Sequence, residues 1–412
     1  MSQAGDDRIS PVGWLIWHPF GMTVLWGAAS SSAQAEGLAA DADAFSWQKS
    51  GRMPNSSDGN GTRSNFREDM HLFAESGLHA IGVGIEWARL EPQPGKIDGD
   101  AIEHYTQVLE SARAAGLSVW VTLQNRTVPG WFVDEGGFLD DKSRGYFWPR
   151  FVDVVAGEMG SLVNAWIPIH DPGGYASVAY SRGIHPPGQR DPEMRAKALR
   201  GCWLAWRDAW RLLRGNGAPV VHSLALSPVF TIDGTVEGAK RARRVDEHTW
   251  DVAVRAISDG ELAVPGLAVI EVPDLQDSGD IVGIAYPGAL ASSEDKLRSY
   301  PPDGRRGDDG VMVWSEGLAL TLHRLAEMLP QRPLAITSYG APSSDAAWQG
   351  DEARLARTVI ETAVQDGIGI EAAFWTPAID GYSFEHGFSL ASGLFDRDRN
   401  PRPALRAWTG QG

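Results

Sequence analysis

The sequence predicts a single (β/α)₈ barrel, and two features of the 412-residue chain lead to this fold class. Short apolar runs alternate with amphipathic helical patterns eight times, and no break in composition marks a second domain. No GxGxxG motif follows the first apolar run, which disfavours a dinucleotide-binding sheet. We therefore expect residues 1–21 to form an N-terminal arm and residues 22–412 to form one barrel.

The predicted strands are short apolar runs that end in turns or polar residues. The clearest is LAITSYG, residues 334–340, where the pattern of a buried strand over residues 334–337 ends in a turn that Gly340 closes. In an alternating β/α chain, chemistry gathers where strands end and loops begin. The eight predicted strands cover residues 23–28, 80–87, 117–123, 163–169, 219–226, 281–286, 334–337 and 369–375.

The predicted helices carry apolar residues at helical spacing. One begins at a cap formed by Asp98 or Asp100 and ends at Gly116. Two long segments without periodicity, 38–61 and 287–311, are predicted loops that leave the carboxyl ends of strands one and six and are placed to cover a pocket. The other predicted helices cover residues 64–77, 143–160, 192–214, 238–257, 315–329 and 351–366, and a tail from Phe384 to Trp408 closes the chain.

Composition limits the classes of partner. The net charge of −16, from 37 basic and 53 acidic residues, disfavours nucleic acid and anionic membranes. The apolar patch from Val12 to Phe20 is too short and too interrupted for a signal peptide or a membrane span, so a cytoplasmic protein is the default expectation. Cys202 is the only cysteine, and no HExxH motif or spaced His/Asp cluster occurs, so we expect no disulfide, metal or cofactor.

Eight stretches between residue 22 and about residue 400 match the landmarks of one enzyme family in order. The most specific is WARLEP followed by PGKID. By these motifs the chain resembles glycoside hydrolase family 1, the β-glucosidase-like enzymes, whose fold is the same (β/α)₈ barrel. The stretches are WGAASSSAQAEG, IEWARLEPQPGKID, VTLQNRTVP, WIPIHDP, GIHPPG, VPDLQDSGDIVGIAY, LAITSYG and IDGYSFEHGF.

The resemblance implies a retaining glycosidase, which needs two carboxyl groups roughly 5–5.5 Å apart. By motif position, however, Ser338 stands where the family has its nucleophilic Glu, and Asp171 stands where it has its acid/base Glu. The resemblance places Arg89 beside the nucleophile position. The chain is thus expected to be a divergent, pseudoglycosidase-like member that lacks both catalytic glutamates.

Other sugar-contacting positions implied by the resemblance also differ from the family. Asn125 and Arg126 replace a His-Trp pair after the third strand, and Ser383 and Phe384 replace a Glu-Trp pair after the eighth. The substrate-binding residues expected from the resemblance and the strand ends are Gln34, Arg89, Asn125, Arg126, Tyr286, Trp375, Ser383 and Phe384.

The candidate catalytic residues are Asp171, His170, Tyr339 and Ser338. A semi-buried carboxyl such as Asp171 can have a raised pKa and act as a general acid, and a histidine exchanges protons near neutral pH. Neighbours on a strand face opposite sides, so His170 and Asp171 are not both expected in the pocket. Tyr339 either enters the pocket or packs in the core. Ser338 is a weak nucleophile without an adjacent base.

Two arginines suggest an anionic substrate. Arg89 and Arg126 would bind a carboxylate unless they pair with local acids such as Glu86 or Asp380. Trp375 is expected to be a platform for a ring. Further polar candidates are Glu36, Glu86, Glu385 and His386.

Three functions stay open. The favoured one is a repurposed enzyme that binds a small sugar conjugate and performs acid/base chemistry, such as ring opening and Amadori-type isomerisation of a glycosylamine, without a covalent glycosyl intermediate. The second is a β-glycosidase with an atypical or substrate-assisted mechanism. The third is a non-catalytic sugar-binding protein. The oligomeric state is open.

Overall fold

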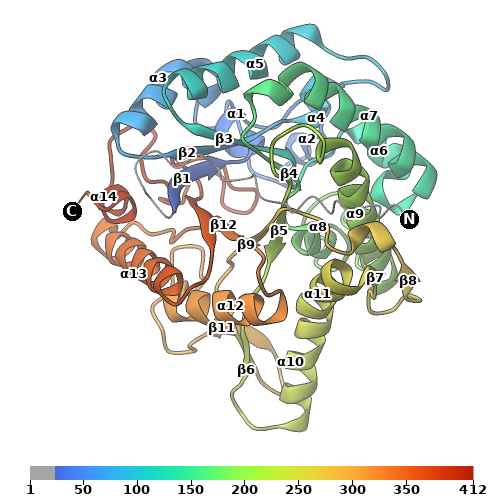
Figure 1. Cartoon of the computed structure of the whole chain (residues 1–412), viewed down its shortest axis with the longest axis vertical. Helices are drawn as coiled ribbons and strands as arrows, with labels where there is room; N and C mark the ends of the chain where they lie inside the picture. The colour runs from blue at the N-terminus through green and yellow to red at the C-terminus, as the bar shows by residue number, and fades with distance from the viewer. Residues whose placement is uncertain (1–23, 412) are drawn as a thin grey trace, which may run out of the picture.

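A computed structural model describes residues 24–411, and it contains the predicted (β/α)₈ barrel (Figure 1). Eight parallel strands form one sheet in the order β4-β3-β2-β1-β13-β12-β9-β5. Parallel bridges from Trp166 to Val220 and from His170 to Ser223 join β4 to β5 and close the sheet into a barrel. The strands are β1 (Leu25–Ser30), β2 (Ala80–Gly84), β3 (Ser118–Gln124), β4 (Ala165–Ile169), β5 (Val221–Ala225), β9 (Ile281–Ala285), β12 (Leu334–Tyr339) and β13 (Ile370–Trp375).

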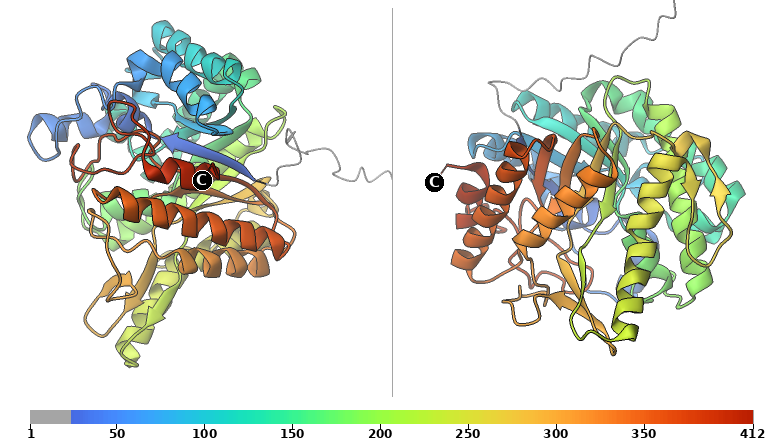
Figure 2. Two further views of the ribbon diagram at one scale, coloured as in Figure 1. Left: turned by 90° about the vertical axis from the view of Figure 1, so that its left-hand side faces the viewer. Right: turned by 60° about the horizontal axis from the view of Figure 1, so that its bottom comes forward.

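Helices surround the barrel, because each helix buries one apolar face against the strands (Figure 2). The C-terminal helices lie side by side, coloured orange to red in Figure 2. The longer helices are α3 (Thr62–Glu75), α5 (Gly99–Ala114), α7 (Asp141–Met159), α8 (Pro172–Tyr180), α9 (Pro192–Leu213), α10 (Val236–His248), α11 (Trp250–Asp259), α12 (Ser315–Met328) and α13 (Ala346–Gln365). The shorter helices are α1 (Ser32–Glu36), α2 (Asp43–Lys49), α4 (Trp87–Leu90), α6 (Gly130–Asp134), α14 (Pro403–Thr409) and the 3₁₀ turns η1 (Gly137–Leu139), η2 (Gly160–Leu162) and η3 (Pro273–Leu275).

The barrel interior is a packed core rather than a pore. Every strand contributes to it, and Trp120 lies 5.0 Å from Phe374 between ring centroids. This layer forms the floor of the space at the carboxyl ends of the strands. Its buried members are Leu25, Ala80, Trp120, Ala165, Ile167, Val221, Ile281, Ala335, Ala372 and Phe374.

The two segments predicted to be loops contain regular structure. Segment 38–61 includes α2, where Ala44 and Trp47 pack with Tyr382, so tertiary burial stabilises a helix that shows no sequence periodicity. Segment 287–311 includes the antiparallel strands β10 (Ala289–Ser292) and β11 (Leu297–Tyr300), which join β6 (Val229–Thr231). With α10 these strands form the projection at the bottom of Figure 1.

Two smaller predictions differ from the structure. The helix predicted over 238–257 is two helices, because the backbone leaves helical geometry at Thr249 (φ −121°, ψ −72°). The tail contains α14, and a two-stranded ribbon, β7 (Glu261–Leu262) with β8 (Ile270–Glu271), precedes β9. The predicted arm, residues 1–21, lies outside the described residues.

Over residues 24–411, every helix is too short or too polar to cross a bilayer.

Candidate active site

A small cavity of about 40 Å³ lies on the interior layer at the carboxyl ends of the strands, and we call it the mouth cavity. Its floor is apolar, with Trp120, Ile167 and Phe374, and its walls carry hydroxyl, amide and imidazole groups. Its complete lining is Ala29, Ser30, Ser31, Gly82, Trp120, Thr122, Asn125, Ile167, His170, Thr337, Phe374 and Thr376. This lining contains no carboxylate and no arginine.

Three polar atoms of the mouth cavity have no hydrogen-bond partner within the described chain. They are Trp120 Nε1, His170 Nδ1 and Thr376 Oγ1, and all three are inaccessible to bulk solvent. Gln124 lies two residues beyond Thr122 on β3, and both of its side-chain polar atoms are also buried without a partner. Buried polar groups in native proteins almost always have partners, so these atoms point to a ligand or ordered water in the cavity.

His170 is the one lining residue that titrates in the ordinary pH range. Its pKa is lowered to about 4 mainly by burial, while the Asp171 carboxylate opposes the shift and the Arg126 guanidinium adds to it. The imidazole is therefore neutral at pH 7, and it is a weaker base than an exposed histidine. Of the predicted catalytic residues, only His170 lines the mouth cavity.

Asp171 lies just beyond the mouth cavity, and its side chain caps a helix and pairs with an arginine. Its backbone is left-handed (φ 50°), and its side chain caps α8, where the Gly174 N–H donates to Oδ1 at 2.7 Å. Arg126 Nη2 contacts Oδ2 at 3.4 Å. Both carboxylate oxygens are engaged, whereas Arg126 Nη1 is buried without a partner in the described chain.

Three predicted aromatic site residues lie in the helix layer instead of the mouth cavity. The hydroxyl of Tyr339 is 3.1 Å from Ser315 Oγ, Trp375 Nε1 donates to the Ser392 carbonyl, and Tyr286 donates to the Trp314 carbonyl. All three are buried. The expected roles of Tyr339 as an acid/base, Trp375 as a platform and Tyr286 as a sugar contact do not fit these positions, because each ring packs between the strands and the helices.

The end of β12 explains the placement of Tyr339. Ala335 and Thr337 face the barrel interior, so strict alternation would also turn Tyr339 inward. The strand register shifts after Ile336, however, and Tyr339 pairs with Trp375 on the outer face. Ser338 is partly exposed, and Thr337 rather than Ser338 lines the mouth cavity.

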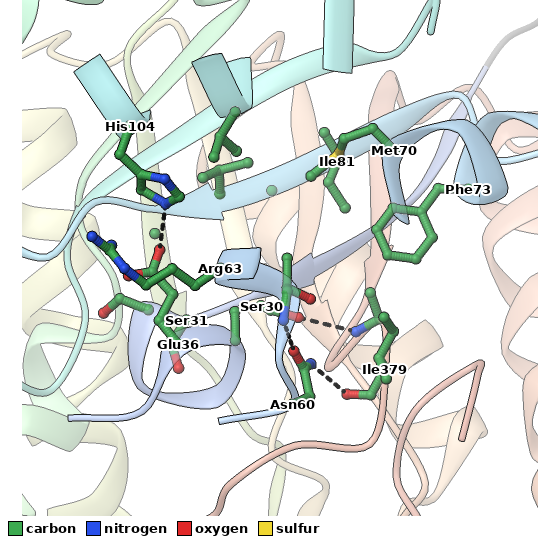
Figure 3. Close-up of a pocket in the computed structure, with 18 residues that line it drawn as sticks. Ser30, Ser31, Glu36, Asn60, Arg63, Met70, Phe73, Ile81, His104 and Ile379 are labelled. Atoms are coloured by element: carbon green, nitrogen blue, oxygen red, sulfur yellow. Dashed lines mark hydrogen bonds and ion pairs between the residues drawn. The ribbon is translucent and has the colours of Figure 1, made fainter. Parts of the chain in front are cut away.

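Arg89 belongs to an ion-pair network around the buried carboxylate of Glu36. Figure 3 shows Glu36 with two other members of this network, Arg63 and His104. Arg89 Nε lies 3.1 Å from Glu36 Oε2, and Tyr105 donates to the same oxygen at 3.0 Å. Burial raises the pKa of Glu36, and Arg89 and Arg63 oppose that shift. We call Glu36, Arg63, Arg89, His104 and Tyr105 the Glu36 network. The acid beside Arg89 is thus Glu36 rather than Glu86 or Asp380.

Two further candidate polar groups also have structural partners. Glu86 is buried and accepts hydrogen bonds from Ser32 and Thr127, at 2.7 and 2.9 Å. Gln34 Oε1 accepts from the Ser31 N–H and completes the capping box of α1. Neither side chain lines the mouth cavity.

The loop after β13 lies over a separate aromatic cluster. Phe384 packs against His185, with ring centroids 4.6 Å apart, and Ser383 pairs with Gly387 in a tight turn. Glu385 contacts Arg182 at 3.6 Å. Ser383, Phe384, Glu385 and His386 therefore lie outside the lining of the mouth cavity.

Sequence reasoning missed most of the mouth cavity. Of the predicted site residues, Asn125 and His170 line it, while the missed residues come from inward positions on the strands. The available signal was the period-two alternation of each strand, which selects Phe374 and Thr376 over Trp375. The missed polar and aromatic residues are Ser30, Ser31, Trp120, Thr122, Thr337, Phe374 and Thr376.

Comparison with known proteins identifies the family. The pattern of glycosyl hydrolase family 1 matches residues 17–252, which is more than half of the chain. The chain belongs to glycosyl hydrolase family 1. "Beta-glucosidase 10" of Arabidopsis thaliana is 31% identical over 94% of this chain and 89% of its own length. "Beta-glucosidase A" of Thermotoga maritima is 20% identical over 90% of this chain and 91% of its own.

Other family 1 relatives are longer than this chain. "Galactolipid galactosyltransferase SFR2, chloroplastic" of Arabidopsis thaliana is 28% identical over 81% of this chain. The chain spans about half of its length, 54%, and 53% of the related rice protein. Among solved structures, a β-glycosidase from Pyrococcus horikoshii aligns with a TM-score of 0.86 at 24% identity, over 95% of this chain and 94% of that one. At this identity the structural likeness shows the fold alone.

Residues 24–411 hold no group of three or more His, Cys, Asp and Glu side chains arranged for a metal ion.

Proposed function

We propose that this family 1 protein binds the sugar part of a small conjugate in the mouth cavity and moves protons on it through His170. The reaction would proceed without a covalent glycosyl intermediate. One observation carries the proposal: buried unpartnered atoms of Trp120, His170 and Thr376 line one cavity at the carboxyl ends of the barrel strands. Donors and acceptors of this kind suit the hydroxyl groups of a sugar.

The retaining mechanism is a poor fit to this cavity. Retaining glycosidases place two carboxyl groups roughly 5–5.5 Å apart on either side of the scissile bond. Ser338 and Asp171 occupy the corresponding motif positions, and a serine hydroxyl without a base is a weak nucleophile. Among the described residues no histidine or carboxylate is hydrogen-bonded to the Ser338 hydroxyl, and the Asp171 oxygens are held by Gly174 and Arg126. The contacts of Ser338 and Asp171 therefore favour a divergent family 1 protein that does not hydrolyse glycosides.

Isomerisation of a glycosylamine needs only proton transfers. After ring opening to an imine, a base removes the proton on C2, and protons return to the nitrogen and to C1 as the 2-hydroxyl becomes a carbonyl. The product has the mass of the substrate, so no co-reactant is needed. The neutral imidazole of His170 supplies the base. General acid–base catalysis contributes about 10²–10⁴-fold and is strongest when the pKa of the base lies near the working pH, so the lowered pKa of His170 places its contribution at the lower end of that range.

Binding without turnover is the second candidate, and the lowered pKa of His170, which makes its imidazole a weak base, favours it. The cavity volume limits both candidates. About 40 Å³ holds roughly three water molecules at ~10–15 Å³ each, so the surrounding segments must move before a whole sugar ring enters. The same hydroxyl, amide and imidazole groups would then bind a sugar conjugate without transferring a proton.

Mass spectrometry tests the proposal with glycosylamines of aromatic acids as substrates. We expect an isobaric product from the wild-type protein and at least a 100-fold lower rate in His170→Gln. His323→Gln, at a surface histidine on α12, is the matched control and retains the wild-type rate.

Two outcomes overturn the assignment. Turnover of aryl β-glycosides at ordinary glycosidase rates would establish hydrolysis instead. The protein could instead bind a sugar saturably, lose that binding in His170→Gln, and give no isobaric product with any substrate of the panel. That result would identify it as a sugar-binding protein and not an isomerase.

A further inference from the structure

A second and larger cavity of about 230 Å³ lies between the end of β5 and helices α8, α9, α10 and α11. It shares no lining residue with the mouth cavity. The two lie on either side of the end of β4, since His170 lines one and Asp171 lines the other. We call it the Arg195 cavity.

The walls of the Arg195 cavity are mostly apolar. Leu199 and Trp203 come from α9, Leu224 and Leu226 from β5 and its end, and Val252 from α11. All five are buried. Such walls suit the apolar body of a small organic ligand. The volume is below the ~300–1,000 Å³ of drug-sized sites, which favours a compact molecule with a single ring or a short chain.

The polar side of the cavity is cationic. Arg195 on α9 forms no hydrogen bond or ion pair through its guanidinium within the described residues. Burial lowers the pKa of Arg195, and no neighbouring acid opposes that shift. The guanidinium is only partly buried, and none of its nitrogens is among the fully buried atoms without a partner, so it is open to an anion that enters the cavity.

The polar groups near Arg195 are an imidazole, two hydroxyl groups and one carboxylate that already has partners. His248 Nδ1 donates to the Arg244 carbonyl at 2.7 Å, and Arg195 adds to the lowering of the His248 pKa, so the two side chains are neighbours. Ser227 and Thr249 bring hydroxyl groups to the lining. Asp171 also lines the cavity, but its carboxylate is already held by Gly174 and Arg126.

We infer that the Arg195 cavity is a binding site for a small organic carboxylate with an apolar body, and that Arg195 binds the carboxylate. A guanidinium holds a carboxylate through two parallel hydrogen bonds, and the leucine, valine and tryptophan walls cover the rest of the molecule. The inference is independent of the chemistry proposed for the mouth cavity, because the two sites share no lining residue.

Calorimetric titration with benzoate, 3-phenylpropanoate and the neutral analogue benzamide tests the charge requirement. We expect the two acids to bind saturably and benzamide to bind at least tenfold more weakly, since hydrogen bonds to a charged group are roughly twice as strong as those between neutral groups. Equal affinity for benzoate and benzamide would overturn the assignment of Arg195 as the carboxylate partner.

Variants locate the site. Arg195→Gln is expected to weaken benzoate binding at least tenfold, and Arg195→Lys is expected to retain part of the affinity. Arg200→Gln, on the same helix but outside the cavity lining, is the matched control and keeps the wild-type affinity. Wild-type affinity in a folded Arg195→Gln protein would exclude this cavity as the site.

A crystal soaked with 4-bromobenzoate gives a test that does not depend on any variant folding. The anomalous signal of bromine is expected between Trp203 and Val252, with the carboxylate at Arg195. Bromine only at the surface or in the mouth cavity would overturn the inference.

Discussion

The Glu36 network lies on helices α1, α3, α4 and α5, whereas the mouth cavity lies at the ends of the barrel strands, and only the network contains a carboxylate. Around Glu36, one carboxylate serves Arg63, Arg89 and Tyr105. Arg89 Nε and His104 Nε2 make no hydrogen bond within residues 24–411, but they lie 3.1 and 4.0 Å from that carboxylate. In the mouth cavity, Trp120 Nε1, His170 Nδ1 and Thr376 Oγ1 have no partner within the same residues and no charged group in the lining. Paired buried polar groups stabilise a fold, whereas unpaired ones are poised for a ligand. Carboxylates are therefore present near the barrel mouth, but the fold already uses them.

The largest expected effect is on the stability of the Glu36 network. Glu36→Ala leaves the buried Tyr105 hydroxyl without its acceptor, which costs about 1–3 kcal/mol, and removes the acid from the partly exposed Arg89 and Arg63. We expect a loss of about 3 kcal/mol in the free energy of unfolding, measured by urea denaturation. The exposed Glu103→Ala on α5 is the matched control. A loss below about 1 kcal/mol would mean that this network contributes little more than a surface ion pair.

A second prediction concerns pH, at the buried carboxyl of Asp43 on α2. Burial raises its pKa to about 8, although hydrogen bonds from the backbone of Val128 and Ala44 oppose the shift. In the unfolded chain the carboxyl ionises near pH 4, so the folded state binds the extra proton between about pH 4 and pH 8. Stability is therefore fully present below pH 4 and falls as the pH rises through 8.

Asp43→Asn removes this titration and keeps an oxygen for the backbone N–H groups. Between pH 5 and pH 8 the wild-type protein is expected to lose stability relative to Asp43→Asn by up to about 1.4 kcal/mol per pH unit. Urea denaturation of both proteins at pH 5, 6, 7 and 8 gives the difference. Parallel curves would show that Asp43 is ionised in the folded protein.

A third prediction concerns an unpaired hydroxyl in the mouth cavity. Thr376→Val keeps the side-chain shape and removes Oγ1, which has no partner in the described chain. We expect the free energy of unfolding to change by less than about 0.5 kcal/mol and sugar-conjugate affinity to fall about tenfold. Calorimetry and denaturation on one preparation provide both values. Reduced stability with unchanged affinity would mark Thr376 as a structural residue bonded to ordered water.

The sequence predicted the barrel better than it predicted the site. The strands follow from apolar runs such as residues 334–337, because burial requires that pattern wherever the strand lies in the barrel. The site depends on which face each terminal residue presents. A register shift after Ile336 turns Tyr339 outward, and a one-residue difference separates Trp375 in the helix layer from Phe374 in the mouth cavity. The partner of Arg89 could not be predicted, because Glu36 is far from it in the chain and only tertiary packing unites them.

The smallest expected effect is at Ser338, where family resemblance would place the largest. Its hydroxyl makes no hydrogen bond to another described side chain and lies outside the mouth-cavity lining, while its backbone carbonyl accepts from the Tyr286 N–H at 2.9 Å, a bond that alanine retains. Ser338→Ala is therefore expected to change the free energy of unfolding by less than about 0.5 kcal/mol and the rate of conjugate conversion by less than twofold. The mass-spectrometric assay that is applied to His170→Gln gives the rate. If Ser338→Ala instead abolished conversion with its affinity intact, the end of β12 would belong to the reaction centre, and His170 would be acting as the base for a serine nucleophile rather than for a carbon acid.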